Sequence, residues 1–137
     1  MVTNQGINHM LDVTLHGAAQ ITTWYIVPFT GNYTPTVADD AASFPGAAGE
    51  AAMQYAEGSR PTFVEGAASG QVIGNTASEG VITATGAVTI YGFGLSSSPL
   101  KGSASGILLA AARFPTPKTL ETGEQLKLTA ELTGVNV

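Results

Sequence analysis

From residue 61 onward, short runs of β-branched and aromatic residues alternate with turns rich in glycine and proline, and this limits what the chain can fold into. Such runs at regular spacing are typical of an antiparallel β-sandwich or a jelly roll. In the run 125–132 every second residue is apolar, which places the apolar side chains on one face of a half-buried strand. The sequence predicts strands near residues 62–65, 71–73, 80–84, 87–95, 106–114 and 125–132.

Two runs also indicate where they lie in a sheet. Residues 87–95 carry apolar side chains on both alternating faces, so we expect a central strand that is covered on both sides. Residues 21–29 are rich in β-branched and aromatic residues and predict a further strand. Pro28 has no backbone N–H, which favours an edge position or the end of that strand.

The N-terminal segment has helical periodicity instead. Ile7, Met10 and Leu11 are spaced i, i+3, i+4 on one helix face. With Asn4 as the N-cap, the sequence predicts a short amphipathic helix over residues 4–15. We expect the β domain to fold without residues 1–16, and assembly to be weakened by their removal.

Residues 30–60 show no strong strand pattern, although residues 47–57 predict a short helix. A long segment with little regular structure is unusual in a compact domain and is often functional. We therefore predict one β-sandwich domain over residues 1–137, with residues 1–20 as an N-terminal helix or arm. Residues 30–60 then form a long loop or an arm that reaches a neighbour.

Charged residues make up 11% of the chain, whereas a soluble domain has about 25%. A surface made largely of Thr, Ser, Asn and Gln is cheap to desolvate, because no isolated charge is buried. The chain is therefore either a low-charge sandwich that is simply soluble or, as we favour, a subunit covered by its neighbours. The net charge of −5 argues against nucleic-acid binding. No apolar stretch is long enough to span a membrane, and residues 1–6 do not resemble a signal peptide.

The titratable residues form no recognisable catalytic pattern. His9 and His16, with Asp12 between them, lie two helical turns or about 10 Å apart, which is too far for one metal ion without a bend. Cysteine is absent, and no nucleophile elbow, phosphate loop or dinucleotide loop occurs. We expect no enzyme, catalytic residue, cofactor or metal. Two alternatives remain, a calcium site or a pair of glycosidase carboxylates. The candidate residues for either are Asp39, Asp40, Glu50 and Glu57.

Six segments in a particular order carry a resemblance to a known family. They are G-I-N-H-M-L-D-V-T-L-H, T-T-W-Y-I-V-P-F, D-D-A-A-S-F-P, R-P-T-F-V-E-G, T-A-T-G-A-V-T-I-Y-G-F-G-L-S-S-S and T-G-E-Q-L-K-L-T-A-E-L-T. This order resembles the small structural proteins of tailed bacteriophages. More narrowly, it is similar to the capsid cement (decoration) proteins of jelly-roll type, such as that of a Bordetella phage.

The resemblance implies a jelly-roll-like antiparallel β-sandwich that acts through its surface. Such a protein binds outside the phage head and bridges neighbouring major capsid subunits, which stabilises the shell. It implies a location in the virion head after synthesis in the host cytoplasm, and a homo-oligomer, dimer or trimer, on the shell. The partner is the major capsid protein, with no nucleic acid, membrane or cofactor.

The alternative class is a binding module, either a phage tail protein or a carbohydrate-binding β-sandwich. An exposed aromatic residue can stack on a sugar or on a protein partner. Most of the ten aromatic residues are more simply explained as core. The candidates for an interface are His9, Met10, Trp24, Tyr25, Tyr33, Phe44 and Tyr55.

Overall fold

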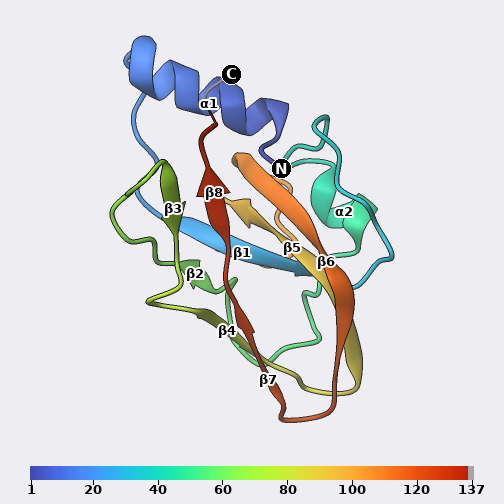
Figure 1. Ribbon diagram of the computed structural model, residues 1–137. Coiled ribbons are helices and arrows are strands. Elements are labelled where there is room, and N and C mark those ends of the chain that lie inside the picture. The colour runs from blue at the N-terminus through green and yellow to red at the C-terminus, as the bar shows by residue number, and fades with distance from the viewer. Residues whose placement is uncertain (136–137) are drawn as a thin grey trace.

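The computed structural model describes residues 1–135, which form a mainly β protein with antiparallel sheets and few helices (Figure 1). This arrangement is consistent with a β-sandwich. The helices are α1 (Asn4–Leu15) and α2 (Phe44–Ala48). The strands are β1 (Trp24–Phe29), β2 (Thr62–Phe63), β3 (Val72–Gly74), β4 (Gly80–Thr83), β5 (Val88–Ser96), β6 (Leu108–Leu120), β7 (Gln125–Leu128) and β8 (Glu131–Thr133).

The largest sheet has four strands in the order β2-β1-β5-β6, with antiparallel pairing throughout. β5 is an inner strand, and its residues 92–96 are all buried, as the apolar character of both faces predicted. Pro28 is the next-to-last residue of β1 and pairs with Phe93 of β5. It lies beyond Trp24 and Tyr25, the two residues that pair with β2, so its missing N–H removes no bond of that pairing.

The run 125–132, predicted as one strand, forms two strands. β7 pairs with β4 and β8 pairs with β3, with a break at residues 129–130. Asn75, which is fully buried, fills the break: its amide oxygen accepts from the Ala130 N–H (2.8 Å) and its amide nitrogen donates to the Leu128 carbonyl (3.0 Å). A side chain therefore makes hydrogen bonds where the ladder is interrupted. The alternation itself is present, since Leu128 is 1% exposed and Lys127 is exposed.

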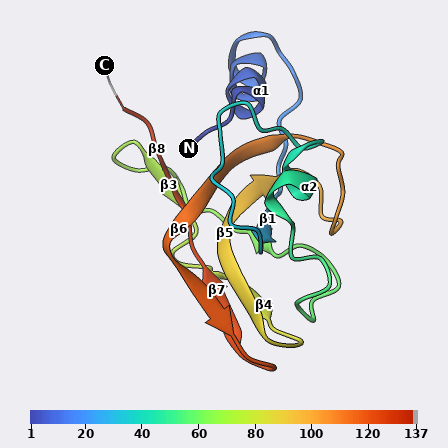
Figure 2. The same cartoon turned by 90° about the vertical axis from the view of Figure 1, so that its right-hand side faces the viewer.

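The buried side chains form two clusters. The larger one joins the four-stranded sheet to the strands β4 and β7 through residues such as Ile26, Ile82 and Leu128. The smaller one packs α2 against β1 and β6, with Phe29 and Phe44 in edge-to-face contact at 5.7 Å. Figure 2 shows α2 beside β1 and β5, at a distance from α1.

Residues 30–60 pack on the domain as a loop rather than extending from it, and they contribute buried residues to both clusters. The helix in this segment lies earlier than predicted, at Phe44–Ala48 instead of residues 47–57. Pro45 stands in its first turn, where a missing N–H breaks no helical bond. Gly49 ends it with φ 68°, a left-handed conformation that favours glycine.

α1 lies across one end of the molecule, opposite the end formed by β4 and β7, and both views agree on this (Figures 1 and 2). Its N-cap is Thr3 rather than the predicted Asn4, because the Thr3 hydroxyl accepts from the Gly6 N–H at 3.0 Å. Among the described residues, no helix has the length and apolar character needed to cross a membrane.

Candidate interaction surface at the N-terminal helix

The start of α1 is fixed to β6 by backbone contacts. The Thr3 N–H donates to the Leu109 carbonyl at 3.1 Å, and the Thr3 hydroxyl donates to the Leu108 carbonyl at 2.5 Å. Val2 pairs with Ala110 of β6, which adds a short antiparallel bridge. Gly6 rests directly on β6, since a Cβ atom there would overlap the Leu109 carbonyl oxygen. The position of α1 is therefore set by its first turn.

The rest of α1 presents apolar side chains to solvent. Ile7, Leu11 and Leu15 are 41%, 51% and 80% exposed, and their i, i+4, i+8 spacing makes them one ridge on the helix surface. His9 and Val13, on the opposite side of the helix, are half-buried towards the domain. We call Ile7, Leu11 and Leu15 the α1 ridge. The amphipathic pattern of this helix therefore turns much of its apolar surface away from its own chain.

A groove of about 550 Å³ runs along the side of the helix that faces the domain, and none of the three ridge residues lines it. We call it the α1 groove. Met10 connects ridge and groove, because it is 43% exposed and also belongs to the groove wall. The rings of His9 and Trp24 meet edge to face at 5.9 Å inside it. The other walls come from β2, β3 and β8: Phe63, Ile73 and Leu132.

The charge around this surface has one sign. Glu65 is the charged residue of the groove wall, and no Lys or Arg lines the groove within residues 1–135. Asp12 is exposed on α1 and is displaced from Leu11 by one residue, on the flank of the ridge away from Met10. One carboxylate therefore lies on each side of the apolar surface.

Three of the seven interface candidates, His9, Met10 and Trp24, meet in the α1 groove. Tyr25 is half-buried on β1 outside it. Tyr33 lies on the smaller core cluster, and its hydroxyl donates to Asp39 at 2.6 Å. This hydrogen bond, with burial and the negative charge of Asp39, raises the pKa of Tyr33.

Phe44 and Tyr55 require a correction, because both are core residues. Phe44 is 1% exposed in the smaller cluster, and Tyr55 is 3% exposed in the larger one. The Lys101 ammonium group covers the Tyr55 ring at 3.6 Å from its centre. Their sequence context, a segment with little regular structure, gave no periodicity that could reveal burial.

The four carboxylates of residues 30–60 each bind a different hydrogen-bonding partner. Asp39 accepts from Tyr33 and from the Thr36 N–H, and Asp40 accepts from the Ser43 hydroxyl. Within residues 1–135, no group of three or more His, Asp or Glu side chains is close enough to hold a metal ion. Glu57 binds Thr83, and Glu50 binds Arg60.

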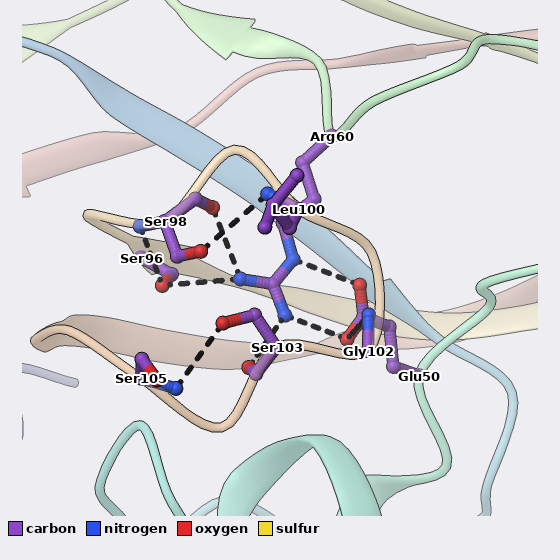
Figure 3. Close-up of polar contacts among 8 residues, drawn as sticks. All are labelled: Glu50, Arg60, Ser96, Ser98, Leu100, Gly102, Ser103 and Ser105. Atoms are coloured by element: carbon purple, nitrogen blue, oxygen red, sulfur yellow. Dashed lines mark hydrogen bonds and ion pairs between the residues drawn. The ribbon is translucent and has the colours of Figure 1, made fainter.

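The pair Glu50–Arg60 is a polar centre that the sequence did not reveal (Figure 3). The guanidinium group binds both carboxylate oxygens, at 2.8 and 2.7 Å, and the two side chains are 3% and 0% exposed. Arg60 also donates to three serines of the segment 96–103, and the Gly102 N–H donates to Glu50 at 3.0 Å. The ion pair thus holds the long loop between β5 and β6 in place.

Comparison with protein-family models and with curated proteins finds no match for this chain.

Proposed function

We propose that this protein is a virion structural protein, a capsid cement protein that binds outside a phage head and bridges neighbouring major capsid subunits. The observation that carries the proposal is the α1 ridge, an apolar surface that the chain exposes on a firmly attached helix. Contiguous exposed apolar residues mark interaction sites on soluble proteins. The low charge of the whole chain supports the same role, because such a surface loses little on desolvation.

The size of the ridge supports binding in many copies. A buried Leu or Ile side chain contributes about 1.5–3 kcal/mol, and these three side chains are only partly exposed. The ridge therefore contributes roughly 3–5 kcal/mol, before the entropy lost on association is subtracted. One such contact is weak, but a ligand that binds only the assembled shell stabilises it by mass action at every site.

We infer a jelly-roll-like sandwich, in which the four-stranded sheet is one layer and the pairs β3–β8 and β4–β7 contribute to the other. The larger core cluster supports this, since it contains residues of both layers. In the proposal the chain works in the virion head as a dimer or trimer, without catalytic residues, cofactor or nucleic acid.

The test is the amount of this chain in purified particles. A cement protein is present at a copy number comparable with that of the major shell protein, and a tail protein at a few copies. The triple variant Ile7→Gln, Leu11→Gln, Leu15→Gln should fold normally and fail to decorate shells. The control variant Met53→Gln, Leu100→Gln changes two other exposed apolar side chains and should still bind.

A low copy number, or normal decoration by the triple variant, would refute the cement function. Glycan binding by the isolated chain that is lost in Trp24→Ala would favour the alternative, a carbohydrate-binding module. That outcome is specific, because Trp24 is the only tryptophan and lines the α1 groove.

A further inference from the structure

We propose that the α1 groove and the α1 ridge bind an apolar protein segment that carries Lys or Arg at its sides. The proposal names the chemistry of the partner segment and rests on the proposed function only for which protein supplies it. The apolar surface has a carboxylate on each side, Asp12 and Glu65, and no Lys or Arg lines its groove within residues 1–135. Apolar burial supplies affinity in such a contact, and complementary charge selects the partner.

The groove has the size and composition to receive apolar side chains. Its volume of about 550 Å³ falls within the range of roughly 300–1,000 Å³ that is usual for binding pockets. Met10 is unbranched and adapts to different shapes, and the Trp24 ring supplies a large flat contact. An apolar segment laid along α1 covers Leu11 and reaches into the groove past Met10.

The carboxylates at the two sides of the surface favour a partner segment with basic side chains. Glu65 lies in the groove wall, and Asp12 lies on the far flank of the ridge. A segment that covers the apolar part brings its own flanking residues next to both carboxylates. Lys or Arg there gains charge–charge attraction, and a cation over Trp24 also gains from the ring face. An acidic segment, in contrast, meets like charge on both sides.

A second copy of the same surface does not supply this chemistry. In a two-fold contact through this surface, each copy meets the ridge and groove of the other, where the charged residues are Asp12 and Glu65 and no Lys or Arg is present within residues 1–135. The five basic residues of the chain lie elsewhere. Arg60 is buried with Glu50, Lys127 pairs with Glu79 at 2.9 Å, and Lys101 lies over the Tyr55 ring. The other two, Arg113 and Lys118, belong to β6. The observations therefore favour a different protein over self-association through this face.

Fluorescence of Trp24 tests the proposal directly, because no other tryptophan contributes to the signal. The purified full chain is titrated with a Leu/Lys amphipathic peptide and with a Leu/Glu peptide of the same pattern. We expect the Leu/Lys peptide to shift the Trp24 emission and the Leu/Glu peptide to leave it unchanged. The double variant Asp12→Asn, Glu65→Gln should weaken Leu/Lys binding about five- to tenfold, as expected for two exposed ion pairs.

Glu121→Gln is the matched control, because Glu121 is an exposed carboxylate in the turn after β6. It should bind the Leu/Lys peptide like the unchanged chain. Equal binding of both peptides, or equal weakening by the control, would overturn the proposal. An emission shift that follows protein concentration without peptide would identify a second copy as the occupant and also overturn it.

The outcomes separate this inference from the proposed function. Peptide binding with no decoration of shells refutes the cement role and leaves the partner chemistry standing. Decoration of shells without selective binding of the Leu/Lys peptide refutes the partner chemistry alone.

Discussion

Arg60 uses every N–H group of its side chain. Its guanidinium has five donors, and these reach the two oxygens of Glu50, the Ser96 hydroxyl and the carbonyls of Ser98 and Ser103. A buried cation is tolerated when it is paired and its remaining donors are satisfied. The pair therefore joins two loops that carry little regular structure of their own.

Arg60→Ala should lower the free energy of unfolding by about 3–5 kcal/mol, because it leaves the buried Glu50 carboxylate without its partner. Urea denaturation followed by circular dichroism measures the loss. Lys127→Ala is the control, since its pair with Glu79 is 69% and 35% exposed and contributes below about 1 kcal/mol. Equal losses in the two variants would show that burial of the Arg60 pair does not matter.

The Glu57 carboxylate should make the free energy of unfolding depend on pH. Burial raises its pKa, but hydrogen bonds from the Thr83 N–H (3.0 Å) and hydroxyl (2.8 Å), with help from Lys101, outweigh burial. The folded-state pKa therefore lies below the ordinary value of 4.5. The ionised Glu57 carboxylate therefore stabilises the folded state above pH 4.5. This stabilisation is lost as the pH falls through the pKa that Glu57 has in the folded state.

Glu57→Gln removes this contribution, so the variant should be less stable than the unchanged chain at neutral pH. The difference between their unfolding free energies should shrink as the pH falls below 4.5. Urea denaturation at several pH values measures it. A difference that is constant over the whole range would contradict the role of the Thr83 contacts.

At the scale of elements, α1 shows how a short contact positions a long helix. The residue nearest to β6 is a glycine, so the helix backbone lies directly on the strand. Beyond Gly6, the ridge side chains point into solvent, whereas His9 and Val13 face the groove between the helix and the domain.

Gly6→Ala should displace α1, because the added methyl group overlaps the Leu109 carbonyl. We expect a loss of about 1–3 kcal/mol, typical of overpacking, and a changed Trp24 emission as His9 moves. Gly58→Ala is the control, since its new methyl group meets no atom within 4 Å. Unchanged stability and emission in Gly6→Ala would show that the close approach is not required.

Strand β7 offers a test of the sheet register. Leu128 is 1% exposed opposite Gly80, so Leu128→Asp buries a charge without a partner. Such a penalty of several kcal/mol is comparable with the total stability of a domain, and we expect unfolding. Circular dichroism and thermal melting measure it. Thr129→Asp, at an exposed neighbouring position, should melt like the unchanged chain, and a cooperative melt of Leu128→Asp would contradict the register.

In the molecule as a whole, the N-terminal segment contributes both to the fold and to the exposed surface. Residues 1–6 belong to the β domain, since Thr3 is fully buried against β6, whereas the ridge beyond them is exposed. The segment 1–20 is thus attached to β6 at its start and exposes the α1 ridge along the helix. Removing it takes away buried hydrogen bonds to β6 as well as the interaction surface.

Deletion of residues 1–16 should therefore lower stability as well as weaken assembly, while the remaining chain still folds. The carbonyls of Leu108 and Leu109 lose their hydrogen bonds from Thr3, each worth about 0.5–1.5 kcal/mol net once water reaches them. Thr3→Val removes only the contacts of the hydroxyl group. Its free energy of unfolding, measured by urea denaturation, should fall by less than that of the truncated chain. A truncated chain as stable as the full one would show that residues 1–6 contribute nothing to the fold.

Features that depend on local periodicity can be predicted from the sequence alone. The alternation around Leu128 and the apolar faces of residues 87–95 predicted strands, because side chains of a strand alternate between faces wherever it lies. The helical spacing of Ile7 and Leu11 indicates an apolar stripe in the same way. That His9, Met10 and Trp24 form an interface stays a prediction, although all three line the α1 groove.

The neighbour that covers each apolar face depends instead on contacts between segments that are distant in the sequence. Periodicity gives the face of an element but not its neighbour, so the outward direction of the α1 ridge depends on where Gly6 meets β6. The split between β7 and β8 depends on Asn75, which is more than fifty residues away in sequence. The pairing of Glu50 with Arg60 likewise arises when two irregular loops meet in the fold, a contact that no local pattern encodes.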